Sequence, residues 1–497
     1  MSNPIVVFDE PELEFRYGQR VIDPRDGLSL FGPYDSDIST HPKTISYITI
    51  GTKMGIQKYL NWVSIINNPA VLAPKDRTQI WPPYPGFEAA FNSEFSPKPV
   101  YVHEIDDKNL HAASIQRNAS ERAFQVVDLY LEGLEKLKKM DEKIGVVICV
   151  VPDEVWLNCR TQSHVVNPIG TRISPKELAK RKSGQLGLIE NYDPNQYLMS
   201  PDFRRQIKAR AMEYDVPIQI IRESTLKTDD NYAFGERRLT PLSDRMWNLN
   251  STIYYKCGGK PWKLVSAREG VCYIGICFRL TGEGNTACCA AQMFLNTGDG
   301  VVFLGEFGPW YSPDDKQFHL TKTAARDLLK GVLDTYMKLE GKQLTEIFLH
   351  SRSTISQEEF DGYKEACPEN VKLVGIRVRP DKLGPRLYRN GEMPVIRGTF
   401  WELNDRCGLL WGTGFKERIA TYDGWEIPVP LRIDIQHGDA SIQRVAQDIY
   451  GLTKLNYNAC KLGDSGPVTV GFSDAVGEIL ISNKTVAVRK PQFKFYI

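Results

Sequence analysis

Residues 271–278, Val-Cys-Tyr-Ile-Gly-Ile-Cys-Phe, form an apolar run with the length and composition of one β-strand. A run without a charged residue is typical of a strand buried on both faces, as in a parallel or mixed sheet covered by helices. Residues 144–152 form a second such run. It follows a segment with apolar residues at helical spacing, namely Phe124, Val127, Leu131, Leu134 and Leu137. An amphipathic helix followed by a buried strand predicts an α/β fold.

Further segments of these two kinds predict two α/β units in series. In residues 106–255 we expect a small doubly wound domain, with a helix opened by Ser200 as N-cap and Pro201, and a strand at 216–221. Residues 256–497 predict a mixed sheet with flanking helices, like the RNase H fold. Its strands are expected at 271–278, 288–295, 301–306, 345–350, 372–378 and 467–471, and its helices near 321–339 and 441–454. Residues 1–105 are rich in turn signals and predict short strands and loops packed on the larger unit.

Charge and cysteine usage narrow the class of protein. The 497-residue chain has a net charge of +1, so its overall balance does not argue for nucleic acid. Residues 201–264 hold 12 Lys/Arg against 8 Asp/Glu, and residues 371–400 hold 7 against 2, which suits a lined groove. On charge alone, solvated helix faces are the better explanation of such segments. Ten cysteines without a C-x-x-C pair indicate a reducing, cytoplasmic location and no structural zinc. No signal peptide or membrane span is expected.

Four residues suit a terminal phosphate. Arg204 and Lys208 are four apart on the expected helix, so both project from one face. Gln219 lies in the next strand, and Lys256 lies at the domain junction. Three cations and one amide could hold a phosphate through charge-assisted hydrogen bonds worth about 1.5–3 kcal/mol each. Taken alone, these residues are more often a solvated helix face and an ordinary strand amide.

The order of motifs around residue 256 resembles the entry to the PIWI domain of Argonaute proteins. It consists of Lys256-Cys257-Gly258-Gly259, a Lys-x-Gly-Gly turn, followed by the Gly-Ile strand at 271–278. Blocks elsewhere, such as Asp23-Pro24-Arg25-Asp26-Gly27 and Leu452-Thr453-Lys454-Leu455-Asn456-Tyr457, extend the resemblance to the short prokaryotic Argonautes over nearly the whole chain. The resemblance implies a Rossmann-like MID domain at 106–255, an RNase H-like PIWI domain at 256–497, and an N-terminal segment, 1–105, packed on PIWI.

The resemblance also implies the binding site for a guide. In MID domains a helix pair spaced i, i+4, a following-strand Gln and a Lys near the junction hold the guide 5′-phosphate, which matches Lys208, Gln219 and Lys256. The first position, often Tyr or His, is Arg204, which contacts phosphate but does not stack under the first base as Tyr does. The carboxylate of Ile497, in an apolar tail, is expected to help hold a Mg²⁺ that bridges guide phosphates.

Two catalytic positions of nucleolytic Argonautes carry other residues here. The first metal-binding Asp corresponds to Cys277, and the Asp of an Arg-Asp-Gly turn corresponds to Ser353. Glu306 and Asp474 are candidates for the two remaining positions. A thiol is a soft ligand that replaces a hard oxygen poorly at Mg²⁺, and two-metal cleavage needs several carboxylates. We therefore expect no cleavage activity.

The expected function is that of a guide-dependent sensor. The resemblance is strongest to the Argonaute subunit of SPARTA-type systems. It implies a 5′-phosphorylated guide RNA, complementary single-stranded target DNA, and a heterodimer with a TIR-APAZ effector. That effector would oligomerise and consume NAD in anti-plasmid or anti-phage immunity. A sirtuin-APAZ or nuclease-APAZ partner is an alternative. An active RNase H-like endonuclease is a second class, and a metabolic α/β enzyme is a third, although the chain lacks phosphate-loop and nucleophile-elbow motifs. The stretch from Trp81 to Phe87 is a candidate partner surface, with packing on PIWI as its simpler explanation.

Overall fold

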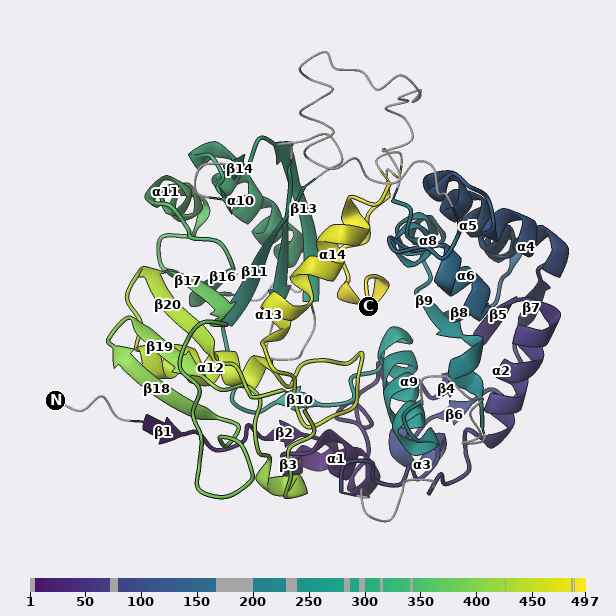
Figure 1. Ribbon diagram of the computed structural model, residues 1–497, viewed down its shortest axis with the longest axis horizontal. Helices are drawn as coiled ribbons and strands as arrows, with labels where there is room; N and C mark the ends of the chain where they lie inside the picture. Colours follow the sequence, from purple (N-terminus) through teal and green to yellow (C-terminus); the bar gives the residue numbers. More distant parts are fainter. Residues whose placement is uncertain are drawn as a thin grey trace.

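The computed structural model describes most of the chain. The described residues are 5–71, 79–166, 200–228, 239–280, 287–294, 300–312, 316–339, 343–424, 426–483, 486 and 488–497. For residues 280, 287–292, 307, 473 and 474 only the backbone is described. Two lobes face each other, with α14 (Ser473–Leu480) and the C-terminal end of the chain between them (Figure 1). Within the described ranges, no helix combines the length and the apolar character needed to cross a bilayer.

The larger lobe is built on a nine-stranded mixed sheet in the order β1-β18-β19-β20-β17-β16-β11-β12-β13. β11 (Val271–Leu280) pairs in parallel with β16 (Glu346–Ser351), which pairs in parallel with β17 (Lys372–Pro380). The other strands are antiparallel to their neighbours: β1 (Ile5–Val7), β12 (Ala287–Phe294), β13 (Gly300–Gly308), β18 (Thr399–Asn404), β19 (Cys407–Leu410) and β20 (Leu431–His437). The predicted strand at 271–278 is thus confirmed, and all of its side chains are buried.

Helices cover both faces of this sheet. α10 (Lys322–Leu339) and α11 (Gln357–Ala366) pack against one face in a cluster that includes Ile274 of β11 and Leu349 of β16. α12 (Ile442–Leu452), α13 (Val468–Gly471) and α14 lie on the opposite face. Gly275 permits the close approach of α13, because a Cβ there would lie 1.9 Å from the main-chain oxygen of Thr469. The two buried faces explain why β11 is apolar throughout.

The smaller lobe holds a four-stranded parallel sheet in the order β7-β5-β8-β9. Its strands are β5 (Tyr47–Gly51), β7 (Tyr101–Glu104), β8 (Val146–Val151) and β9 (Ile218–Arg222). It is flanked by α2 (Lys53–Ile65), α4 (Asp107–Ser114), α5 (Ala119–Glu135), α6 (Asp153–Asn158) and α8 (Phe203–Ala211). The expected boundary between residues 105 and 106 cuts through this sheet, because β5 and β7 precede it. The N-terminal segment therefore does more than pack on the larger unit.

Short elements complete the connections between the lobes. α9 (Leu242–Lys256) leads from the smaller lobe into the larger one. Two further helices are α1 (Pro24–Leu30) and α3 (Phe87–Phe91). The small sheets are β10-β2-β3 (Lys263–Leu264, Leu13–Glu14, Arg20–Val21), β4-β6 (Thr44–Ile45, Glu94–Phe95) and β14-β15 (Tyr311–Ser312, Gln317–Phe318). Phe87, in the stretch offered as a partner surface, is buried and packs against Phe91 and Phe95, so its side chain is not available to a partner.

Two local expectations were wrong. The strand expected at 467–471 is absent, because Val468–Gly471 form helix α13 with Pro467 as its N-cap, although Val468, Thr469 and Val470 favour strands by propensity. Packing of this turn on Gly275 overrides that preference. The helix expected to open at Ser200 begins at Phe203 and is capped by Asp202, whose side chain accepts a hydrogen bond from the Arg205 N–H at 3.0 Å. The Ser200 N–H instead donates to the main-chain oxygen of Ser482 at 2.7 Å.

Candidate functional site

Helix α8 places Arg204 and Lys208 one turn apart, facing the interface between the lobes. Phe203 and Ile207 on the same helix are buried in the core of the smaller lobe and fix its rotation. Lys208 is 3% exposed, and its Nζ donates a hydrogen bond to the main-chain oxygen of Ile497. A lysine buried to this extent is rare unless its charge has a use or a partner.

Lys256 approaches the same place from the last residue of α9. It is 1% exposed, and its Nζ donates to the Gln219 side-chain oxygen at 2.6 Å and to the Ile218 main-chain oxygen at 2.8 Å. The Gln219 amide nitrogen donates to the Ile220 main-chain oxygen at 3.0 Å, which fixes the amide with its oxygen toward Lys256. Lys208 and Lys256 lie within hydrogen-bonding and electrostatic reach of each other. Four elements from both lobes therefore meet at one cluster.

Mutual repulsion and burial define the electrostatics of this cluster. Burial is the main cause that lowers the pKa of Lys256 to about 7, and repulsion by Arg204 adds to it. Burial is also the main cause that holds the pKa of Lys208 well below its usual range, and repulsion by the charges of Lys256 and Arg204 lowers this pKa further. Burial also lowers the pKa of Arg204. Among the described residues, no Asp or Glu side chain forms an ion pair with either lysine. Three cationic side chains thus gather around one Ile497 oxygen, and a phosphate would supply the further negative charge that balances them.

All five residues expected at the phosphate site thus lie together: Arg204, Lys208, Gln219, Lys256 and Ile497. Ile497 is 3% exposed and follows a 3-10 turn at Phe493–Phe495. For a Mg²⁺ ion, the described residues supply little beyond an Ile497 oxygen, since they contain no group of three or more His, Cys, Asp or Glu side chains that could hold a metal. The donor set therefore fits a metal whose other ligands come from phosphate and water.

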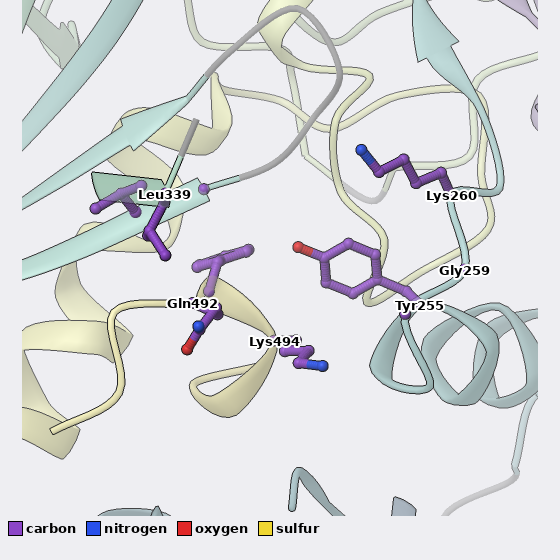
Figure 2. A pocket seen from close by; sticks show the side chains of 10 residues that line it. Tyr255, Gly259, Lys260, Leu339, Gln492 and Lys494 are labelled. Carbon is purple, nitrogen blue, oxygen red and sulfur yellow. The ribbon is translucent and has the colours of Figure 1, made fainter. Parts of the chain in front are cut away.

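A cavity of about 240 Å³ lies beside this cluster, at the connection between α9 and the larger lobe (Figure 2). It is lined by Tyr255, Lys260, Leu339, Gln492 and Lys494, among others. The ring of Tyr255 lies between Lys260 and Lys494. Burial lowers the pKa of Lys494. Two further lysines, Lys260 and Lys494, therefore line the cavity.

The structure describes the side chains at three of the four positions expected for a cleavage site. Cys277 is buried near the end of β11, and its neighbour Ile276 pairs with Ser351 at the end of β16, two residues before Ser353. The two positions therefore lie near the carboxyl ends of two neighbouring parallel strands. Glu306 is exposed on β13, separated from β11 by β12. The side chain of Asp474 lies outside the described residues.

One residue near both places was missed by sequence reasoning. The Glu478 carboxylate on α14 lies 2.8 Å from an Arg205 guanidinium nitrogen and 3.9 Å from one of Arg279, two residues after Cys277. Ser482 strengthens the same junction, since its hydroxyl donates to the Arg205 main-chain oxygen at 3.1 Å. No local pattern predicts contacts between residues about 200 or more positions apart. Glu478 links the phosphate-site helix to the strand that carries Cys277.

Comparison with solved structures identifies the fold. The model superposes on Clostridium butyricum Argonaute bound to a guide DNA and a 19-mer target DNA with a TM-score of 0.63 and 16% sequence identity. This match covers 99% of the present chain and 55% of the other. Aquifex aeolicus Argonaute with externally bound siRNA gives a TM-score of 0.57, 14% identity, and coverage of 99% and 56%. No protein-family model and no curated protein matches the sequence.

These matches confirm the expected fold class. The chain has the mixed α/β architecture of the MID and PIWI domains of Argonautes, with a large central sheet. It spans a little over half of the length of these solved proteins. At such low identity the likeness concerns the fold.

Proposed function

We propose that this protein binds a 5′-phosphorylated guide nucleic acid and, through it, a complementary single-stranded target. The observation that carries the proposal is the cluster of the buried Lys208 and Lys256 with the half-buried Arg204, in which neither lysine is paired with an Asp or Glu side chain among the described residues. A phosphate dianion matches the charge, the hydrogen-bond donors and the small size of this cluster. One of the solved Argonautes with this fold is bound to a guide and a target.

The guide is proposed to be RNA and the target DNA, as in the SPARTA-type relatives that the sequence resembles. A Mg²⁺ ion at the 5′-end would be held by the Ile497 oxygen and by guide phosphates, and would neutralise part of their charge. The side chains of this protein would make the other contacts to the phosphate. Lys208, Lys256 and Arg204 attract the phosphate, and Gln219 orients the Lys256 ammonium.

We further propose that the protein does not cut its target. Cys277 and Ser353 stand where hard oxygen ligands are needed, and a thiol and a hydroxyl do not replace two carboxylates at paired metals. A PIWI domain without cleavage can still bind a guide–target duplex by its shape and backbone. Its output must then pass to another protein. We propose that this protein forms a heterodimer with an APAZ effector. The effector carries a TIR domain that depletes NAD in defence against plasmids or phages, and a sirtuin or nuclease domain is the alternative.

Binding and cleavage assays test this function together. The purified protein should bind a 5′-phosphorylated guide RNA more tightly than the 5′-hydroxyl guide of the same sequence, and the loaded protein should then retain complementary single-stranded DNA. The DNA should stay intact with Mg²⁺ or Mn²⁺. Equal binding of both guides would contradict the phosphate site. Cleaved DNA would instead support the alternative, a guided endonuclease.

A further inference from the structure

The nine-stranded sheet ends in a short, partly uncovered edge strand. β1 is the last strand in the sheet order and pairs with β18 alone among the described strands (Figure 1). Val6 faces the main core, whereas its neighbours Ile5 and Val7 are 52% and 53% exposed. β1 is only three residues long, yet its two outward side chains leave an exposed apolar strand edge, a kind of surface that proteins normally cover. Its persistence here points to a partner.

The exposed side chains continue onto the outer face of the neighbouring strands. Ile5 pairs with Trp401 of β18, and Trp401 pairs with Leu409 of β19. Trp401 belongs to a small apolar cluster that includes Leu387 and Leu403, all three of them half-buried. On this side of the sheet, α10 and α11 pack over β11 and β16, while the cluster over β18 and β19 is covered by residues 387–395. The apolar surface is therefore only partly shielded.

A basic loop borders this surface. Residues 382–389 contain three basic residues and no acidic one. The Arg386 guanidinium donates to the main-chain oxygens of Lys382 at 2.6 Å and Gly384 at 2.8 Å, which gives the loop a defined shape. Leu383 is fully exposed at its tip, and Tyr388 is 71% exposed. The Asp381 carboxylate lies close to Gly384 of this loop, so residues 381–389 together carry a net charge of +2. Apolar side chains beside a surface of net positive charge complement an apolar segment flanked by carboxylates.

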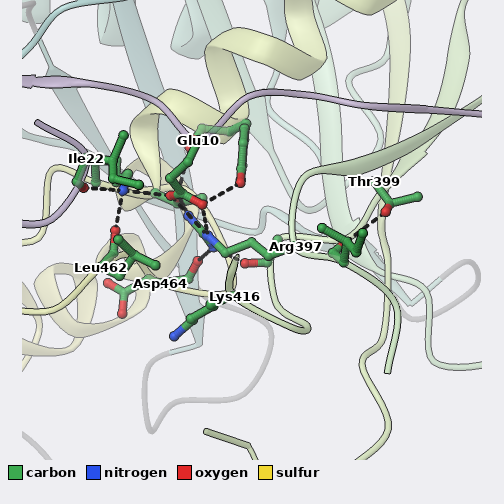
Figure 3. A network of polar contacts seen from close by, with 12 residues as sticks. Glu10, Ile22, Arg397, Thr399, Lys416, Leu462 and Asp464 are labelled. Carbon is green, nitrogen blue, oxygen red and sulfur yellow. Dashed lines mark hydrogen bonds and ion pairs between the residues drawn. The ribbon is translucent and has the colours of Figure 1, made fainter. Parts of the chain in front are cut away.

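The edge strand is also held rigidly. Phe8 N–H donates to the Gly398 main-chain oxygen at 3.0 Å. Glu10 lies 3.1 Å from an Arg397 guanidinium nitrogen and 2.6 Å from Lys454 Nζ, and it accepts the Tyr450 hydroxyl at 2.7 Å (Figure 3). Burial opposes ionisation of Glu10, but these two cations hold its pKa at about 2. A strand fixed in this way would lose little further entropy when a partner binds.

We infer that this edge, formed by β1, Trp401, Leu403 and the loop 382–389, is the docking site for a partner protein. The partner adds an extended apolar strand beside β1, and acidic residues next to that strand face the basic loop. Because alternate residues of a strand direct their N–H groups to opposite sides, the Val7 N–H faces the open edge when that of Phe8 is bonded to Gly398. Strand addition of this kind takes affinity from main-chain bonds and specificity from side chains.

The inference rests on the proposed function, in which this protein forms a heterodimer with an effector. The experiment therefore measures the binding of the partner and the binding of the guide separately. The probe is the protein encoded beside this chain, co-expressed with it. The test variant is Ile5→Lys with Val7→Lys. The matched control is Met54→Lys with Ile115→Lys, which alters two exposed apolar side chains of the smaller lobe. Complex formation is measured by mass photometry, amide protection by hydrogen exchange, and guide affinity on the same preparations.

The expected result is a one-to-one complex in which the Val7 amide becomes protected. The test variant should lose at least tenfold in partner affinity, the control should keep it, and all three proteins should bind the guide equally. A complex that leaves Val7 unprotected, or that tolerates the test variant, would overturn the inference. So would self-association of the chain through β1, or a neighbour that does not bind although the guide does. Loss of guide binding in the unaltered protein would instead contradict the proposed function itself.

Discussion

Guide binding should weaken with rising pH because of Lys256. Burial and the neighbouring Arg204 lower the Lys256 pKa to about 7 in the free protein. A bound phosphate would restore the ordinary pKa, so binding requires proton uptake by the uncharged fraction of the protein. The 5′-phosphate has a second pKa of about 6 and is largely dianionic above pH 7, so the ligand contributes little to the change. The titration of the lysine therefore dominates.

The size of the effect follows from the charged fraction. With a pKa of about 7, Lys256 is charged in about one half of the molecules at pH 7, about one in 11 at pH 8 and about one in 100 at pH 9. The apparent Kd scales with the inverse of the competent fraction. It should therefore rise about fivefold between pH 7 and 8, and about 50-fold between pH 7 and 9. The low pKa of Lys208 would steepen the dependence further.

The assay compares a 5′-phosphorylated guide with a 5′-hydroxyl guide of the same sequence by fluorescence anisotropy from pH 7 to 9. The ratio of the two Kd values removes effects common to both strands. Lys256→Arg should flatten this ratio because guanidinium stays charged, and Lys256→Gln should lower the preference for phosphate at pH 7. A phosphate preference in the unaltered protein that is the same at pH 7 and pH 9 would refute the reasoning.

Three further changes test other parts of the account. Arg204→Ala with Lys208→Ala should weaken binding of the 5′-phosphorylated guide at least 100-fold, measured by the same anisotropy assay, because two charge-assisted contacts worth about 1.5–3 kcal/mol each are lost. Glu10→Gln should reduce the free energy of unfolding by about 3–5 kcal/mol in denaturant titrations, since it leaves two buried cations without their carboxylate. Cys277→Asp alone should give no target cleavage on gels with Mg²⁺ or Mn²⁺, because Ser353 still leaves a gap in the metal site.

Matched controls keep these tests specific. Arg210→Ala removes a cation from the same helix that pairs with Asp128 on another face, and it should leave guide affinity within twofold. Asp26→Asn removes an exposed ion pair with Arg418 and should cost less than about 1 kcal/mol. Equal losses in test and control variants would contradict the roles assigned to the buried groups. Target cleavage by the Cys277→Asp variant would contradict the claim that Ser353 also leaves the metal site incomplete.

The sequence predicted the parts of the molecule that depend on local patterns. The unbroken apolar runs anticipated β8 and β11, because strands buried on both faces contain no polar positions. The i, i+4 spacing of Arg204 and Lys208 anticipated a shared helix face. That Lys256 and Ile497 join them came from the resemblance to Argonautes and not from spacing.

The remaining features depend on contacts between distant residues. β5 pairs with both β7 and β8 across long insertions, so the turn-rich first 105 residues did not indicate the place of β5 and β7 in the sheet. Residues 467–471 have strand propensity, but the close approach of this turn to Gly275 selects a helix. Glu478 meets Arg205 only after both lobes have assembled. Tertiary packing decides all three.

The most direct test of the central claim is to purify the protein from cells that carry its native operon and to sequence any bound nucleic acid, with its 5′-end chemistry determined. The account predicts short RNAs with 5′-phosphates, and their loss from the protein with Arg204→Ala and Lys208→Ala. A purified protein without nucleic acid, or with strands that carry 5′-hydroxyl ends and survive that double change, would contradict it.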